Sequence, residues 1–261
     1  MPSSSAGSTS RIFITGASSG TGEALARHYA AQGATLGLVA RRGAELGRLA
    51  AEFGAATRTY ACDVRDAQSM RAAAADFVAR HGSPDVVIAN AGISRGTLTQ
   101  VSADTRAFEE IIAINLIGMV NTFQPFVDAM TTARRGKFVG IASVAGYRGL
   151  PGAAAYSASK AAVIAYLEAL RVELNPSGVR VITICPGYIA TPMTKGNPYP
   201  MPFLLSADAA ATKIGRIIER GASYAVIPWQ MAVLARILRV VPNWLFDRVL
   251  MDAPRKPRRT E

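Results

Sequence analysis

Histidine and cysteine are scarce in this chain, with two residues of each among 261. His28 and His81 stand alone in predicted helices, and we find no spacing of metal-ligand residue types in the sequence. We therefore predict no metal site. Cys62 and Cys185 each end an apolar segment, and a single pair of thiols is not the disulfide framework of a small secreted domain. We expect both thiols to be reduced, for which a cytoplasmic enzyme is the simplest context.

Long hydrophobic runs are missing as well. No uninterrupted apolar stretch reaches the ~18 residues that a membrane-spanning helix needs, so we expect no integral membrane protein. Residues 1–10 are rich in Ser, Gly and Ala, with neither a basic start nor an apolar run. This composition predicts a flexible head rather than a signal peptide.

Acidic residues are outnumbered, at 18 against 29 basic residues, which gives a formal net charge of +11. Such a balance raises the question of a nucleic-acid partner. The basic residues are mostly arginines scattered over predicted helices, with no nucleic-acid-binding module and no aromatic stacking platform. We therefore predict no nucleic-acid partner.

Apolar strand patterns alternate with helical patterns along most of the chain, and half of its residues are hydrophobic. The alternation predicts an α/β fold of the Rossmann type: a doubly wound, parallel, seven-stranded sheet with helices on both faces. One dinucleotide-binding catalytic domain should span residues 11–228, with an amphipathic helical extension and basic tail at 229–261. The predicted strands are 11–15, 35–40, 57–62, 85–89, 136–142, 179–185 and 224–228. The predicted helices are 22–32, 44–53, 68–80, 105–132, 154–174 and 207–220.

A glycine-rich turn follows the first predicted strand and leads directly into a helix. Strand, glycine turn and helix form the context that a nucleotide-binding glycine motif requires. Glycine permits a tight turn and a close approach of a pyrophosphate, and the helix start favours the anion. The candidate cofactor-binding residues here are Gly16, Ser18, Ser19, Gly20, Thr21 and Gly22.

Two arginines, Arg41 and Arg42, end the second strand. They lie roughly 20 residues past the glycine turn, where an NAD enzyme presents an acid to the ribose 2′-hydroxyl. A guanidinium can instead bind a 2′-phosphate through two parallel hydrogen bonds. The sequence therefore favours NADP(H) over NAD(H), although one of the two arginines could simply be solvated at the strand end.

Tyr156 lies thirteen residues after Ser143, and Lys160 follows Tyr156 by four residues in the same predicted helix. This spacing puts an ammonium beside a phenol on one helix face. A nearby cation favours the phenolate and lowers a tyrosine pKa that is ordinarily near 10, which suits general acid/base catalysis.

These motifs together resemble the short-chain dehydrogenase/reductase family in its compact single-domain branch. The resemblance covers residues 10–228. It rests on the run Thr15–Gly22, Cys62-Asp63-Val64, Asn90-Ala91-Gly92, Asn115, Ser143, Tyr156 with Lys160, and Pro186-Gly187 with Thr191. Thr21 stands where the family more often has isoleucine, a change we expect to be tolerated.

The resemblance implies the catalytic roles. Ser143 should hydrogen-bond the substrate oxygen, and Tyr156 should exchange a proton with it. Lys160 should bind the nicotinamide ribose and lower the tyrosine pKa, while Asn115 should hold a water that links Lys160 to solvent. The further cofactor-binding residues implied are Asp63, Val64, Asn90, Ala91, Gly92, Tyr156, Lys160, Pro186, Gly187, Ile189 and Thr191.

The implied function is an NADP(H)-dependent oxidoreductase that interconverts a carbonyl and a secondary alcohol, with the cofactor supplying the hydride. The alternative is a catalytically silent protein of the same fold, a cofactor sensor or scaffold. The serine, tyrosine and lysine are all present, which favours the enzyme. Family habit also implies a homodimer or homotetramer that packs through helices 105–132 and 154–174.

Substrate choice should lie in three loops, at 93–97, 144–155 and 188–205. Their side chains are mostly apolar or aromatic, which favours a bulky apolar substrate. Arg148 is the one residue among them that we single out as able to pair with a substrate carboxylate or phosphate.

The C-terminal segment 229–261 alternates large apolar residues with arginines, carries both tryptophans, and should break into two helices at Pro242. Three interpretations remain open for it. It could pack on the domain or on a partner subunit, cover an apolar substrate pocket, or dock peripherally on an anionic membrane.

Overall fold

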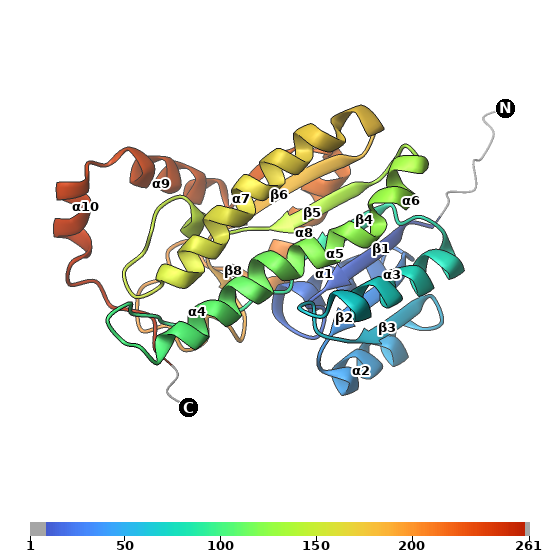
Figure 1. Cartoon of the computed structure of the whole chain (residues 1–261), viewed down its shortest axis with the longest axis horizontal. Coiled ribbons are helices and arrows are strands. Elements are labelled where there is room, and N and C mark those ends of the chain that lie inside the picture. The colour runs from blue at the N-terminus through green and yellow to red at the C-terminus, as the bar shows by residue number, and fades with distance from the viewer. Residues whose placement is uncertain (1–8, 259–261) are drawn as a thin grey trace.

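The fold is a three-layer α/β sandwich built on a seven-stranded parallel sheet in the order β3-β2-β1-β4-β5-β6-β9 (Figure 1). The structure is a computed structural model, and it describes residues 9–258. The strands are β1 (Arg11–Thr15), β2 (Thr35–Ala40), β3 (Thr57–Ala61), β4 (Val86–Ala89), β5 (Lys137–Ile141), β6 (Arg180–Pro186) and β9 (Tyr224–Ile227). The chain reverses direction across the sheet between β1 and β4, as in a doubly wound Rossmann sheet. The predicted fold class is confirmed, and the predicted flexible head lies mostly outside the described residues.

Helices cover both faces of the sheet because its inner strands are buried on both sides, whereas the edge strand β3 is mostly exposed. On one face lie α1 (Gly20–Ala30), α2 (Gly43–Phe53) and α8 (Ala207–Arg220), whose side chains share a core cluster with Leu36, Leu38 and Ile182. On the other lie α3 (Ala67–His81), the helical segment from α4 (Asp104–Ile112) to α6 (Val127–Thr132), and α7 (Ala154–Leu174). Two short strands that the sequence did not predict, β7 (Ile189–Ala190) and β8 (Leu205–Ser206), pair with each other outside the main sheet.

The predicted helix 105–132 is a chain of short helical pieces rather than one regular helix. Between α4 and α6 lie a π-helical turn at η1 (Ala113–Ile117), then α5 (Gly118–Phe123) and a 3-10 turn at η2 (Gln124–Phe126). By length and composition alone, the stretch Asp104–Thr132 is apolar enough to cross a membrane. Phe123, Phe126 and Met130 are buried in the second core cluster, so packing in the domain accounts for this hydropathy.

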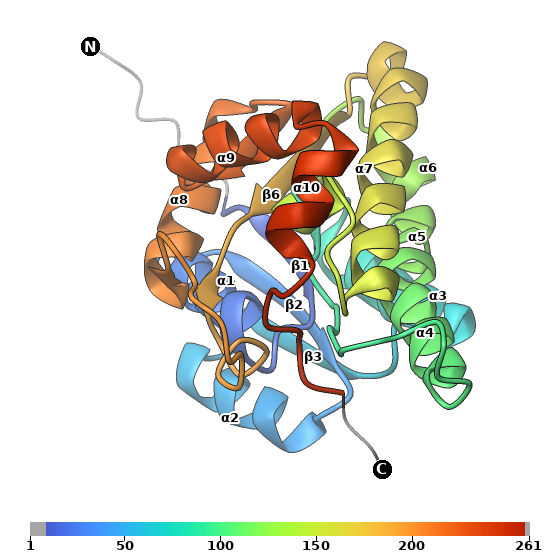
Figure 2. The same ribbon diagram turned by 90° about the vertical axis from the view of Figure 1, so that its left-hand side faces the viewer.

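The C-terminal extension leaves the sheet after β9 and forms two helices, α9 (Trp229–Val240) and α10 (Asn243–Leu250). The predicted break at Pro242 is confirmed, since this proline stands immediately before α10. Figure 2 shows α9 running across one end of the molecule and α10 turning down in front of the sheet, with the tail continuing down toward the C-terminus.

Candidate active site

The predicted site residues converge because they follow strands whose carboxyl ends share one edge of the sheet. The glycine turn follows β1, Asn90 follows β4, Ser143 follows β5, and Gly187 follows β6. Since β1 and β4 are neighbours at the topological switch point, the crevice between their loops is the place where such a sheet binds ligands.

The glycine turn has the backbone that its sequence demands. Gly16 and Gly20 have φ values of 69° and 57°, in the left-handed region that glycine adopts at no steric cost. At Gly22, the first turn of α1 lies so close to the carbonyl of Gly16 that a β-carbon would overlap it. The turn therefore leaves its backbone bare, as the approach of a phosphate group requires.

Two neighbouring segments hold this turn in place. The side-chain amide of Asn90 donates to the carbonyl oxygens of Thr15 and Gly16 at 3.1 and 3.3 Å. A β-carbon at Gly20 would lie 3.1 Å from Cγ2 of Thr191, so the segment after β6 reaches the same turn. The predicted cofactor segments are therefore in direct contact with one another.

The two arginines at the end of β2 have different surroundings. Arg42 turns back over the glycine turn, and its Nε and Nη2 donate to the hydroxyl of Ser18 at 3.2 and 3.0 Å. Arg41 is exposed and, after Arg65, is one of the charges that keep the pKa of Asp63 below its usual range. A cationic group thus borders the glycine turn on the side of β2.

Ser143, Tyr156 and Lys160 form one cluster at the carboxyl end of β5. Lys160 is 5% exposed, donates to the carbonyl of Ile141 at 2.7 Å, and lies 5.8 Å from the ring centre of Tyr156. Burial lowers the pKa of Lys160 to about 8. Burial also raises the pKa of Tyr156, and its hydrogen bond with Ser143 opposes that rise. The cluster therefore places a proton donor beside a hydroxyl and an amine.

Asn115 joins the cluster through a partner that sequence reasoning missed. It is fully buried in the π-helical turn, and its amide donates to the hydroxyl of Ser159 at 2.9 Å and to the carbonyl of Ile93 at 3.0 Å. Ser159 in turn donates to the carbonyl of Tyr156 at 2.8 Å. The signal for Ser159 was present, because it lies three residues after Tyr156 and so shares a helix face with it.

Arg148 does not serve the substrate role that we considered for it. Its Nη1 donates to the carbonyl of Leu238 at 2.6 Å, its Nη2 donates to Oδ1 of Asn243 at 2.8 Å, and its guanidinium stacks 3.9 Å from the ring centre of Phe246. These bonds satisfy carbonyls at the end of α9, which would otherwise lack partners. Arg148 is therefore an anchor for the C-terminal extension.

The tail after α10 touches all three loops that were predicted to select the substrate. The amide of Gly96 donates to the carbonyl of Pro257 at 3.1 Å, and Nζ of Lys256 donates to the carbonyl of Met193 at 3.4 Å. A β-carbon at Gly152 would lie 2.8 Å from that of Arg255. The tail thus contacts each of the three loops, and the alternative in which it covers an apolar substrate pocket stays a prediction.

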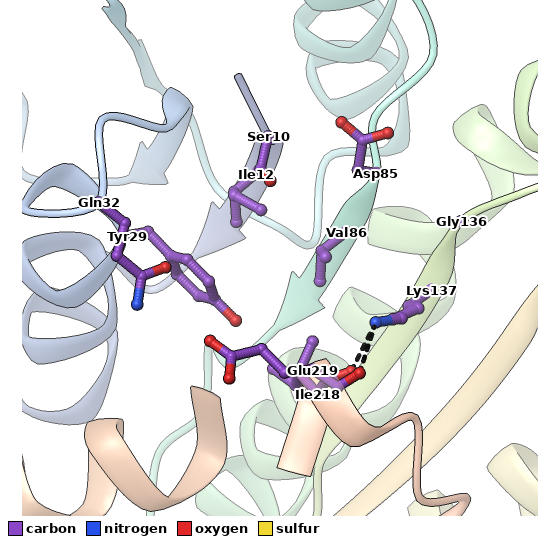
Figure 3. Close-up of a pocket in the computed structure, with 10 residues that line it drawn as sticks. All are labelled: Ser10, Ile12, Tyr29, Gln32, Asp85, Val86, Gly136, Lys137, Ile218 and Glu219. Carbon is purple, nitrogen blue, oxygen red and sulfur yellow. Dashed lines mark hydrogen bonds between the residues drawn. The ribbon is translucent and has the colours of Figure 1, made fainter. Parts of the chain in front are cut away.

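At least two cavities are present in the described part of the chain. One of about 320 Å³ opens at the amino ends of β1, β4 and β5, beside Tyr29, Asp85 and Lys137 (Figure 3). It lies at the edge of the sheet away from Ser143, Tyr156 and Lys160. The other, of about 980 Å³, lies between α4 and the tail, with Arg65 at one end and Arg258 among its lining residues. Because Arg65 follows the predicted adenine-facing pair, this second cavity borders the cofactor side of the cleft.

A doubly wound sheet with a bare glycine turn at its switch point, and with Ser143, Tyr156 and Lys160 clustered at the same edge, defines a Rossmann-type protein. The short chain dehydrogenase family model matches residues 10–199, and the chain belongs to this family of oxidoreductases.

Known relatives agree with this assignment. An uncharacterized oxidoreductase of Myxococcus xanthus is 39% identical over 238 residues, which is 90% of this chain and 94% of the relative. A short chain dehydrogenase from Burkholderia cenocepacia, solved in complex with NADP, is 26% identical with a TM-score of 0.80, over 93% of this chain and 98% of its own. A 3-ketoacyl-(acyl-carrier-protein) reductase from Brucella melitensis, solved with NADH, is 26% identical with a TM-score of 0.77, over 84% and 96% of the two chains.

Proposed function

We propose that this protein is an NADP(H)-dependent oxidoreductase that interconverts a carbonyl and a secondary alcohol. The observation that carries the proposal is the placement of Ser143, Tyr156 and Lys160 together, at the carboxyl edge that also bears the glycine turn. A nicotinamide cofactor, when bound, supplies or accepts the hydride. The protein then has to bind the cofactor, hold the substrate oxygen and move one proton.

The residues at the switch point fit a dinucleotide. The bare backbone at Gly16, Gly20 and Gly22 and the amino end of α1 suit a pyrophosphate. Asp63 and Val64 would border the adenine, Asn90, Ala91 and Gly92 the middle of the cleft, and the segment from Pro186 to Thr191 the nicotinamide. The solved relatives with NADP and with NADH support a nicotinamide cofactor.

The proton would pass through Tyr156. Ser143 is close enough to oppose the rise in the pKa of Tyr156, which suits the two hydroxyls to hold one substrate oxygen between them. Burial raises the pKa of Tyr156, and Lys160 is not among the groups that shift it in this structure, so the predicted lowering by its ammonium stays a prediction. The predicted water at Asn115 stays a prediction, since the Asn115 side chain is engaged with Ile93 and Ser159.

The preference for NADP(H) rests on Arg42. It is fixed against Ser18 at the end of β2, where a cofactor 2′-phosphate would lie, and Arg41 adds a second positive charge. Fluorescence titration of the purified protein with NADPH and NADH tests the proposal: we expect NADPH to bind at least about tenfold more tightly. Binding of neither would oppose the enzyme proposal. Tight NADPH binding without turnover of any carbonyl would support the silent sensor instead.

The substrate is proposed to be bulky and apolar. The loop from Tyr188 to Leu205 brings the rings of Tyr188 and Tyr199 to 6.3 Å from each other and exposes Met193. With Arg148 engaged by the extension, the three loops offer mainly aromatic and aliphatic surface. A screen of ketones and aldehydes of graded size, read by NADPH oxidation, would identify the class.

The tail that contacts the three loops should influence this size preference. Nε and Nη2 of Arg258 donate to the carboxylate of Asp104 at 2.8 and 3.0 Å, and this pairing keeps the pKa of Asp104 below its usual range. We expect Asp104→Asn to loosen the tail and to raise kcat/KM for a bulky ketone about threefold relative to a small one, a modest change because the pair is partly exposed. Arg106→Gln, on the same helix and cavity, is the matched control. An unchanged ratio of the two kcat/KM values would show that the tail does not influence substrate selection.

The exposed helices of one face bear on the oligomeric state, and the cysteines bear on the cellular location. We propose a homodimer or homotetramer that packs through α4 to α7, a surface on which Phe108, Ile117 and Val172 are exposed. A monomer in light scattering at micromolar concentration would oppose it. The proposed location is the cytoplasm, which the free thiols of Cys62 and Cys185 support.

A further inference from the structure

The outer face of α9 carries an apolar stripe that no described part of the chain covers. Trp229, Val233, Ile237 and Val240 recur every three or four residues, and their exposed fractions are 70, 46, 51 and 78%. Residues at this spacing share one helix face. Met231 lies on the opposite face, is 3% exposed, and packs closely against Gly187. The helix is therefore apolar on two sides, of which the domain uses one.

The next helix continues the exposed surface. Trp244 is 70% exposed and Val249 66%, and Met251 just after the helix is 66% exposed. On the side of α10 that faces the domain, Phe246 stacks on the guanidinium of Arg148. The two helices stand together at one end of the molecule, away from α2 and α3 (Figure 1). Large apolar residues exposed on two neighbouring helices indicate a site of interaction with a partner or a membrane.

Charge decides which partner fits this surface. Arg236 and Arg239 are exposed within α9, and Arg248 is exposed in α10. Asp247 and Asp252 are the acidic residues between Trp229 and Arg258. If two copies met through this surface, like charges would face one another with few acids to offset them. A partner with many negative charges over an apolar interior would offer ion pairs to the arginines and apolar contacts to the stripe.

We propose that α9 and α10 dock this protein on the surface of an anionic lipid bilayer, with the two tryptophans at the level of the headgroups. Tryptophan suits this position because its ring is apolar and its N–H can meet the wet interface. Arginine can extend its apolar stem along the bilayer surface and keep its charge among the phosphates. The docking does not depend on the proposed reaction, because none of these side chains belongs to the catalytic cluster.

The connection to the cleft is rigid. Arg148, in the loop between Ser143 and Tyr156, is bonded to both ends of the α9–α10 junction through Leu238 and Asn243. The same extension continues into the tail that contacts the three loops. Docking therefore brings the mouth of the cleft near the bilayer, which would favour an apolar substrate that is dissolved in lipid; this last consequence rests on the proposed function.

The chain contains a built-in reporter for the test, because its two tryptophans are Trp229 and Trp244. Titration of the full-length protein with phosphatidylcholine vesicles that contain phosphatidylglycerol should shift tryptophan emission to shorter wavelength and sediment the protein. Vesicles of phosphatidylcholine alone should bind at least about tenfold more weakly, since each basic residue near an anionic surface contributes about fivefold. High salt should weaken the binding. Trp229→Tyr and Trp244→Tyr each leave one reporter and show which helix docks.

Charge variants supply the control. Arg236→Gln with Arg239→Gln should weaken binding to the anionic vesicles about 25-fold. Arg58→Gln with Arg71→Gln, which removes two exposed charges from β3 and α3, should leave it within about twofold. No vesicle-induced shift, or an equal loss for both pairs, would overturn the proposal. If tryptophan emission shifted with increasing protein concentration in the absence of lipid, the surface would instead be a contact between copies of this chain.

Discussion

Replacing Tyr156 by phenylalanine is expected to lower kcat by about 10³-fold while NADPH affinity stays within about threefold. The substitution removes one hydroxyl from a side chain whose ring remains packed beside Lys160. Without the hydroxyl no group at that position can exchange a proton with the substrate oxygen, so the barrier rises in the chemical step. The glycine turn and Arg42, which are proposed to bind the cofactor, are untouched.

Steady-state turnover of the best ketone from the screen, paired with NADPH titration by fluorescence, measures both quantities on one preparation. Thermal unfolding of the variant should match that of the wild type, which separates lost chemistry from lost folding. Ser157→Ala is a suitable control because Ser157 lies on the same helix and contacts the backbone of Leu150 instead. A variant that keeps more than a tenth of wild-type turnover would show that Tyr156 is not the proton carrier.

The sheet was predictable from the sequence because its signals are local. Apart from β3, the strands are largely apolar and contain many β-branched residues, and each predicted strand boundary lies within one residue of the observed one. The catalytic cluster was predictable for the same reason: Tyr156 and Lys160 are joined by helix geometry, and the carboxyl ends of parallel strands bring Ser143 and the glycine turn to the same edge. The roles of these residues were predicted from the family resemblance, and the fold explains why the residues lie close together.

The contacts of the C-terminal extension could not be predicted, because they join residues far apart in sequence. Arg148 carries the same charge whether it meets a substrate phosphate or the carbonyl ends of α9, and only the position of α9 decides between them. The pairing of Arg258 with Asp104 spans most of the chain. The π-helical turn at Asn115 was missed as well, since Ala113–Ile117 contains no glycine or proline that would mark a break in the helix.

Replacing both Arg41 and Arg42 by alanine is expected to weaken NADPH binding about 10- to 100-fold and NADH binding less than about threefold. The difference arises because only NADPH carries the 2′-phosphate, and a hydrogen bond to a charged group contributes about 1.5–3 kcal/mol. Arg42→Ala alone should produce most of the loss, because Arg42 is already held against Ser18 and loses little freedom on binding. Arg41→Ala should have the smaller effect, since both arginines are exposed but only Arg42 is held in place by Ser18.

Ser18→Ala tests whether that orientation matters. It removes the hydroxyl that accepts from Arg42 but keeps the guanidinium charge, so NADPH binding should fall only a few-fold and less than in Arg42→Ala. Arg58→Ala, at an exposed position on the neighbouring strand β3, is the matched charge control and should bind both cofactors normally. Fluorescence titration of each variant with both cofactors is the measurement. An equal loss of NADPH and NADH in the double variant would mean that the arginines support the glycine turn itself, and the preference for NADP(H) would then lose its basis.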